Sequence, residues 1–114
     1  MQVQLTTDNH VNGGEGLKRH VESVVRDTLE RFGARVTRVD VHVGDANGRK
    51  SGSEWCSMEA KLAGLQPVAV KVEAATLNVA IDNAAEKLLK VLDRTLGRKE
   101  DPKGGATVRK NGGQ

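Results

Sequence analysis

Apolar and polar residues alternate along three segments in the middle of the chain. Residues 36–43 read VTRVDVHV, which places Val39, Val41 and Val43 on one face of an extended strand and polar side chains on the other. Residues 54–63 and 67–73 repeat this pattern. A period of two residues is typical of strands whose sheet has one buried face and one face in water. A shorter alternation, QVQL at residues 2–5, predicts a fourth strand.

Two other segments have the period of an amphipathic helix. From Leu17, apolar side chains recur at intervals of three and four residues as far as Phe32, and we expect this helix to end at Gly33. The second predicted helix begins after Thr76, which suits an N-cap, and ends at Gly97, which suits a C-cap. The predicted order is β-α-β-β-β-α, an α+β fold in which two helices pack on one face of a four-stranded sheet.

The chain has 114 residues, which is enough for one domain with a single core. We expect this domain to span residues 1–99, and residues 100–114, EDPKGGATVRKNGGQ, to form a flexible basic tail because they contain few apolar side chains. The first residues lack the features of a signal peptide, and no segment approaches the ~20 apolar residues that cross a bilayer. The single cysteine, Cys56, excludes an internal disulfide. We therefore expect a cytoplasmic protein without a membrane partner.

The charges of the last helix are sorted by sign. On a helical wheel that advances about 100° per residue, its other basic side chains lie within roughly 60° of Lys87. We call this set the basic stripe: Lys87, Lys90, Arg94 and Arg98. A separate sector holds the acidic row, which comprises Asp82, Glu86 and Asp93. Interleaved charges would stabilise an isolated helix better, because Glu and Lys at i,i+4 attract each other. The sorting therefore indicates a negatively charged partner.

The distribution of charge over the whole chain favours the same interpretation. The formal net charge is only +3, which does not by itself imply a nucleic-acid partner. Residues 76–114, however, hold eight Lys or Arg against five Asp or Glu, whereas the residues before them balance. A local basic field attracts polyanions even when the net charge is small.

Other functional classes find little support. The three histidines and Cys56 lack the spacing of metal ligands, so we expect no metal and no cofactor. Asp40 and Glu59 are expected near each other on the wet face of the sheet, but no nucleophile accompanies them, and we expect neither enzymatic activity nor a small-molecule substrate. Trp55 is expected on the same face, where it could stack on a base.

The element order and the segments AIDNAAEKLLKVLDR, VHV and MEAKLAG resemble the HPF/RaiA family of ribosome hibernation factors, in its short, single-domain form. The resemblance covers about residues 1–99. It implies a fold like that of double-stranded RNA-binding domains, and a non-enzymatic protein that inhibits translation by binding rRNA of the small ribosomal subunit near the tRNA and mRNA sites. The basic positions of the family's last helix correspond to Lys87, Lys90 and Arg94. In the first helix this chain departs from the family, and Lys18, Arg19 and Arg26 occupy neighbouring positions.

The resulting hypothesis assigns rRNA phosphate contacts to two groups of residues. The first comprises the basic stripe and the residue after it: Lys87, Lys90, Arg94, Arg98 and Lys99. The second is peripheral and comprises Arg49 and Lys50 in a glycine-rich loop, with Lys18 and Arg26 in the first helix. The alternative hypothesis is a protein interaction module in which the basic stripe docks an acidic partner such as a transcription regulator.

Overall fold

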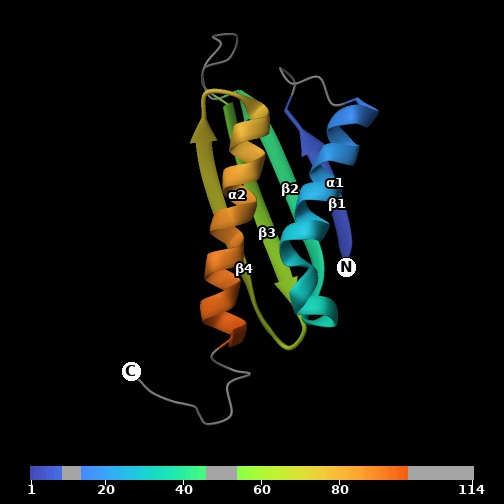
Figure 1. Cartoon of the computed structure of the whole chain (residues 1–114), viewed down its shortest axis with the longest axis vertical. Helices are drawn as coiled ribbons and strands as arrows, with labels where there is room; N and C mark the ends of the chain where they lie inside the picture. Colours follow the sequence, from blue (N-terminus) through green and yellow to red (C-terminus); the bar gives the residue numbers. More distant parts are fainter. Residues whose placement is uncertain (9–13, 46–53, 98–114) are drawn as a thin grey trace.

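The computed structural model describes residues 1–8, 14–45 and 54–97. The elements follow the predicted order (Figure 1): β1 (Gln2–Thr7), α1 (Glu15–Leu29), η1 (Glu30–Arg35), β2 (Val36–Asp45), β3 (Glu54–Leu62), β4 (Leu65–Ala74), α2 (Leu77–Leu92) and η2 (Asp93–Gly97). The predicted α+β fold is therefore confirmed. No helix in these ranges is long and apolar enough to cross a membrane.

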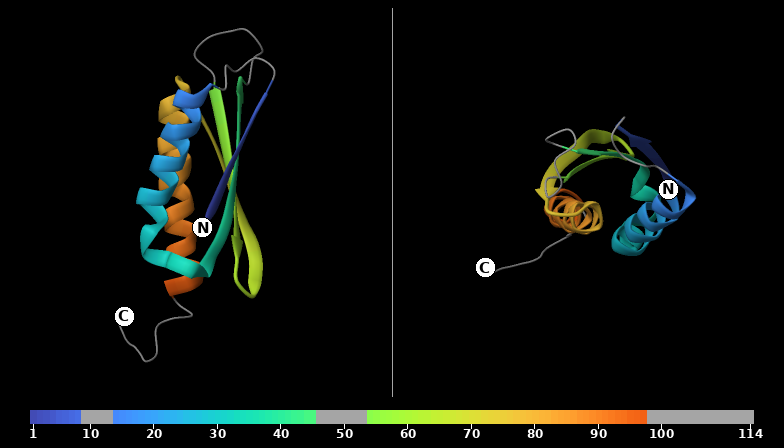
Figure 2. Two further views of the ribbon diagram at one scale, coloured as in Figure 1. Left: turned by 90° about the vertical axis from the view of Figure 1, so that its right-hand side faces the viewer. Right: turned by 90° about the horizontal axis from the view of Figure 1, so that it is seen from above.

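The four strands form one sheet in the order β1-β2-β3-β4. β1 pairs with β2 in parallel, and the other neighbours are antiparallel. The parallel pair requires a crossover, which α1 provides. Both helices lie on the same face of the curved sheet, as the view from above in Figure 2 shows. The opposite face is open and carries the polar residues of the alternating segments.

The core lies between the sheet and the two helices, as the alternation predicts. Val39, Val41 and Val43 of β2 are fully buried, as are Cys56 and Ala60 of β3. From the helical side, the buried residues share the apolar faces of α1 and α2: Val21, Val25, Leu29, Ala80, Ile81, Ala84, Ala85, Leu88 and Leu92. Val68 and Val72 of β4 are only partly buried because β4 is an edge strand.

Several predicted boundaries are wrong by a few residues. The first strand extends to Thr7, and β4 spans 65–74 rather than 67–73. The α-helical part of the first helix begins at Glu15 and ends at Leu29. The chain then tightens into the 3₁₀ segment η1, where Gly33 has a φ of 54° that other residues rarely adopt. Phe32 remains buried in η1, which is why the apolar pattern continues past the end of α1.

The boundaries of the last helix agree with the prediction at its start and differ near its end. Thr76 caps α2, because its Oγ1 accepts a hydrogen bond of 3.2 Å from the N–H of Val79. The α-helical geometry ends at Leu92, and the wider turn η2 continues to Gly97. Leu96 of η2 is buried, so packing of this side chain holds the last turn against the core.

Candidate nucleic-acid interface

The three sectors of α2 have three different environments. The apolar sector lies on the sheet, with Ile81, Leu88 and Leu92 fully buried. The described members of the basic stripe, Lys87, Lys90 and Arg94, are exposed to solvent. Lys87 and Arg94 are seven positions apart, or about 10 Å along a helix axis. Within the described part of the chain, no ion pair engages these three side chains. They therefore present uncompensated positive charge on the solvent side of α2 and the start of η2.

Two members of the acidic row, Asp82 and Asp93, face the first helix. The Nε2 atom of His20 on α1 lies 3.5 Å from Oδ1 of Asp82 on α2. Eleven residues further along each helix, Arg31 and Asp93 form an ion pair. Both pairs have a sequence separation of 62, and eleven residues correspond to about three helical turns. The helices consequently run side by side in the same direction, as Figure 1 shows.

This arrangement explains half of the charge sorting. Asp82 of α2 pairs with α1, and Asp93 of η2 pairs with η1, so the neighbouring helical segment determines where these negative charges lie. In the sequence, the interval from His20 to Arg31 equals the interval from Asp82 to Asp93. Only the packing of the helices shows that these residues form pairs. The described members of the basic stripe, Lys87, Lys90 and Arg94, are exposed and have no such partner among the described residues.

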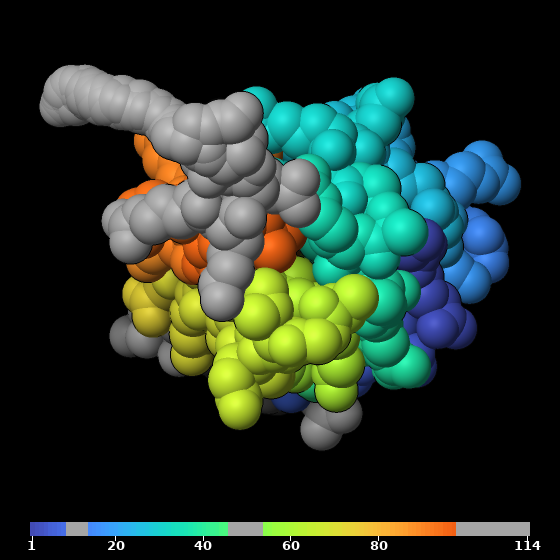
Figure 3. Space-filling model, turned by 90° about the horizontal axis from the view of Figure 1, so that it is seen from below, coloured from blue at the N-terminus to red at the C-terminus, as the bar shows by residue number. Residues whose placement is uncertain are grey.

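The segments η1, the β3–β4 turn and η2 come together at the end of the molecule seen in Figure 3. Arg31 and Arg35 both belong to η1. The guanidinium carbons of Arg31 and Arg35 lie 5.4 and 5.7 Å from the centroid of the Phe32 ring. The Nε of Arg35 also donates a hydrogen bond of 3.2 Å to the Phe32 carbonyl oxygen. Both cations therefore make contacts within the fold, and no pattern in the sequence indicates this role for Arg35.

The two first-helix candidates lie away from the basic stripe. Arg26 donates through Nη1 to the carbonyl oxygen of Met1 at 3.1 Å, and Lys18 borders a hollow beside β1. Both therefore occupy the side of α1 that faces β1, opposite the side that carries His20. The other four candidates, Arg98, Lys99, Arg49 and Lys50, lie outside the described residues. The described candidates thus form two separate groups rather than one continuous surface.

Trp55 lies on the open sheet face, as the alternation predicts, and is partly exposed. Its indole packs on the backbone of Gly44, where a Cβ would come within 2.7 Å of three ring atoms. The Lys71 ammonium lies 4.7 Å from the ring centroid, within the range of a cation–π interaction. Stacking of a base on this ring would therefore require Lys71 to move.

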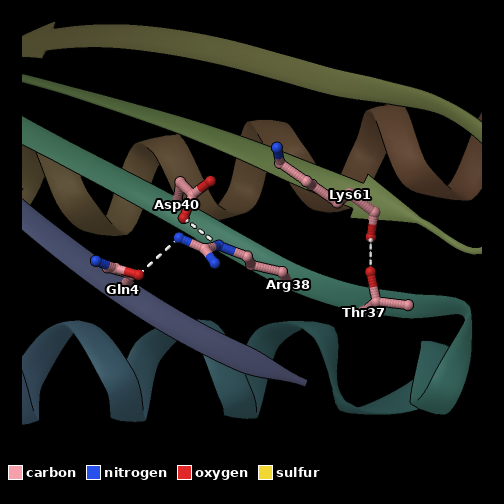
Figure 4. A network of polar contacts seen from close by, with 5 residues as sticks. All are labelled: Gln4, Thr37, Arg38, Asp40 and Lys61. Carbon is pink, nitrogen blue, oxygen red and sulfur yellow. Dashed lines mark hydrogen bonds and ion pairs between the residues drawn. The ribbon is translucent and has the colours of Figure 1, made fainter.

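A polar network holds the centre of the open face (Figure 4). The Nε of Arg38 donates to Asp40 Oδ1 at 2.7 Å, and its Nη2 donates to Gln4 Oε1 at 2.6 Å. Asp40 is the direct cross-strand partner of Glu59, and both border a hollow of about 420 Å³. Arg38 compensates Asp40, which explains how two carboxylates are tolerated in facing positions. The hydrogen bond from Arg38 to Gln4 also joins the side chains of β2 and β1.

The thiol of the single cysteine, Cys56, is buried in the core. Cys56 is fully buried, and desolvation raises the pKa of its thiol to about 12. The thiol is consequently protonated at neutral pH, and a thiol in that state is a poor nucleophile and a poor metal ligand. Within residues 1–8, 14–45 and 54–97, no three His, Cys, Asp or Glu side chains are grouped so as to hold a metal ion.

Comparison with known proteins agrees with the fold. The N-terminal domain of Protein Y from Thermus thermophilus has a TM-score of 0.70 and 22% identity, covering 83% of this chain and 99% of its own. A ribosomal subunit interface protein from Coxiella burnetii has a TM-score of 0.70 and 15% identity, covering 85% and 99%. At these identities the likeness shows the fold.

The sequence itself shows the family. A search of curated proteins finds no match to the chain. Residues 4–100, however, match the family described as Sigma 54 modulation protein / S30EA ribosomal protein. This match covers most of the chain and extends from within β1 past the end of η2. The chain therefore belongs to the Sigma 54 modulation protein / S30EA ribosomal protein family, the HPF/RaiA family of ribosome-associated proteins that its motifs resemble.

Proposed function

We propose that this protein is a ribosome hibernation factor that inhibits translation by binding rRNA of the small subunit near the tRNA and mRNA sites. It acts in the cytoplasm and without enzymatic activity. Its membership of the family and its likeness to a ribosomal subunit interface protein support association with the ribosome. The observation that carries the rRNA contact is the exposed, unpaired positive charge of Lys87, Lys90 and Arg94.

The chemistry of the partner follows from these three side chains. Lys and Arg at successive turns of one helix can each meet a phosphate of an RNA backbone, and such contacts position the protein without reading the sequence. Each neutralised phosphate releases counterions, so the affinity falls as salt rises. Three contacts predict a slope of log K against log[salt] of roughly −2 to −3. Contacts by Arg98, Lys99, Arg49, Lys50, Lys18 and Arg26 would make the slope steeper.

The test is sedimentation of the purified protein with ribosomes through a sucrose gradient at low and high salt. The wild type is expected to travel with the small subunit at low salt, and Lys87→Glu/Lys90→Glu/Arg94→Glu is expected to remain at the top. A matched control, Arg19→Glu/Lys61→Glu/Lys71→Glu, changes the net charge equally at other exposed positions and should still sediment. Circular dichroism establishes that both variants are folded.

Two outcomes would contradict the proposal. If the stripe variant and its control sediment equally well, the basic stripe is a solvated face and does not bind rRNA. If the wild type fails to sediment, the alternative in which the stripe docks an acidic partner such as a transcription regulator becomes the better account. Competition by free RNA separates these partners, because polyanion displaces an electrostatic RNA contact and has less effect on a shape-specific protein contact.

A further inference from the structure

A hollow of about 370 Å³ lies between the two helical segments that cover the sheet. We call it the interhelical groove, and it is bordered by Asp27, Thr28, Glu30, Arg31 and Leu89. Leu89 of α2 is half-buried against the core and supplies an apolar floor. Val24 is also half-buried, and it follows His20, the α1 residue that faces α2, by one helical turn. The groove thus has an apolar floor between two helices that lie side by side (Figure 1).

Carboxylates line both sides of this groove. Asp27 and Glu30 border the hollow from α1 and η1. Glu86 lies one turn before Leu89 on the same side of α2. All three carboxylates are on exposed residues, and none of them forms an ion pair within the described part of the chain. They therefore place three uncompensated negative charges around one apolar floor.

The neighbouring cations do not cancel this charge. Arg31 borders the groove but is paired with Asp93, so the two together add no net charge. Arg26 is held toward β1 by its hydrogen bond to the carbonyl oxygen of the first residue. Lys90 belongs to the basic stripe, in another sector of α2, and Arg19 precedes the hollow by about two helical turns. The occupant that fits this groove is therefore cationic and carries an apolar side chain.

The chain itself contains a segment with this chemistry. Beyond the last described residue, residues 102–114 read PKGGATVRKNGGQ and have no acidic side chain, but three cationic ones: Lys103, Arg109 and Lys110. The two acidic residues that precede this segment, Glu100 and Asp101, are balanced by Arg98 and Lys99. Val108 directly precedes Arg109, so one apolar side chain stands next to two adjacent cations. This combination complements an apolar floor with carboxylates beside it.

The length of the connection allows this segment to reach the groove. Val108 follows Gly97 by eleven residues, which span at most about 36 Å when extended. Leu89 precedes Gly97 by eight residues, or about 12 Å along a helix axis. The connection is therefore long enough to turn back with slack. A short tether of this kind gives the segment an effective concentration in the millimolar range, so even a weak contact is populated.

We propose that residues 106–110, ATVRK, bind the interhelical groove of their own chain. Val108 packs on Leu89, and Arg109 and Lys110 lie at the carboxylates of Asp27 and Glu30. RNA is not a suitable occupant, because its phosphates are repelled by the same carboxylates. The contact goes beyond the proposed function: it covers the acidic side of the helical layer and leaves the basic stripe free.

The test uses the full-length ¹⁵N-labelled protein with a nitroxide spin label on Gly112→Cys. Cys56 is fully buried and its thiol is protonated at neutral pH, so the label reacts with the introduced cysteine alone. The amide signals of Thr28 and Leu89 should lose most of their intensity while the nitroxide is oxidised and recover it on reduction. The amide signals of Thr6 and His42, paired residues of β1 and β2, should keep theirs.

Charge variants separate specific binding from the proximity that a tether alone produces. Arg109→Glu/Lys110→Glu and, separately, Asp27→Asn/Glu30→Gln should each lower the ratio of bound to free segment roughly fivefold. The signal loss at Thr28 and Leu89 should then largely disappear. Glu59→Gln/Glu73→Gln removes the same amount of negative charge from β3 and β4 and should leave the signal loss unchanged. Circular dichroism establishes that each variant is folded.

Three results would each overturn the proposal. The first is full signal intensity at Thr28 and Leu89 in the labelled wild-type background. The second is a signal loss that both charge variants retain, because that loss reflects the tether alone. The third is an equal loss when the nitroxide is carried only by a second, unlabelled copy mixed with ¹⁵N-labelled chain, which would assign the contact to another molecule. None of these measurements includes a ribosome, so their failure is distinct from failure of the rRNA hypothesis.

Discussion

Arg31 of η1 forms an ion pair with Asp93 of η2, and this pair joins the ends of the two helices that cover the sheet. The side chains remain 57% and 50% exposed, so water screens their attraction. Asp93 directly precedes Arg94 in η2. The ion pair links η1 with η2, the segment that carries Arg94 of the surface that we propose to bind rRNA.

Removal of this ion pair should have a small effect on stability. We expect Asp93→Asn to lower the free energy of unfolding by less than about 1 kcal/mol, as is usual for exposed pairs. Urea denaturation of Arg31→Ala, Asp93→Ala and the double variant would give the coupling energy. Strictly additive effects of the two single substitutions would show that the pair contributes nothing to stability.

Introduction of a methyl group beneath Trp55 should be costly. In Gly44→Ala the new Cβ would lie 2.7 Å from the indole ring, so the ring must move off the strand. Such overpacking typically destabilises by about 1–3 kcal/mol. In the background of Trp55→Ala the same substitution should cost much less, because the clashing ring is absent. Equal thermal shifts in both backgrounds would contradict this account of the Gly44–Trp55 contact.

Glu86 should weaken RNA binding by the wild type. It is exposed and belongs to the acidic row, but unlike Asp82 and Asp93 it has no ion pair among the described residues. Its charge lies beside Lys87 and is one helical turn from Lys90, so it opposes an approaching phosphate. Glu86→Gln is expected to raise ribosome affinity roughly two- to fivefold at low salt, measured by sedimentation. Glu73→Gln, on β4, is the control and should have no effect.

Burial of Cys56 should make stability fall at high pH. The pKa of its thiol rises from 9.0 to about 12 on folding, so between these values the unfolded chain loses a proton that the folded chain retains. The free energy of unfolding therefore decreases as pH rises through this window, with a limiting slope of about 1.4 kcal/mol per pH unit. Well below pH 9 the thiol is protonated in both the folded and the unfolded chain, so it adds no pH dependence to the free energy of unfolding. Comparison of urea midpoints for wild type and Cys56→Ala isolates it, since the variant should lack this part of the decline.

Much of the fold could be predicted because it depends on local periodicity. The alternation around Val41 and Met58 determines which side chains are buried, and both are at most 1% exposed. The end of the first helix was less predictable, because a 3₁₀ turn and an α-helix both keep Phe32 on the apolar side. The role of Gly44 was not predictable either, since it depends on Trp55, the residue that pairs with Gly44 on the neighbouring strand β3.

The candidate interface also has features that the sequence determines and features that only the tertiary structure shows. The sequence alone determined that Lys87, Lys90 and Arg94 share one side of a helix, because helical geometry relates residues three and four positions apart. Only the tertiary structure decided that Asp82 and Asp93 face α1, and that Lys18 and Arg26 lie beside β1 rather than beside the basic stripe. These relationships depend on how two helices are placed on one sheet, and that placement results from packing among residues far apart in the chain.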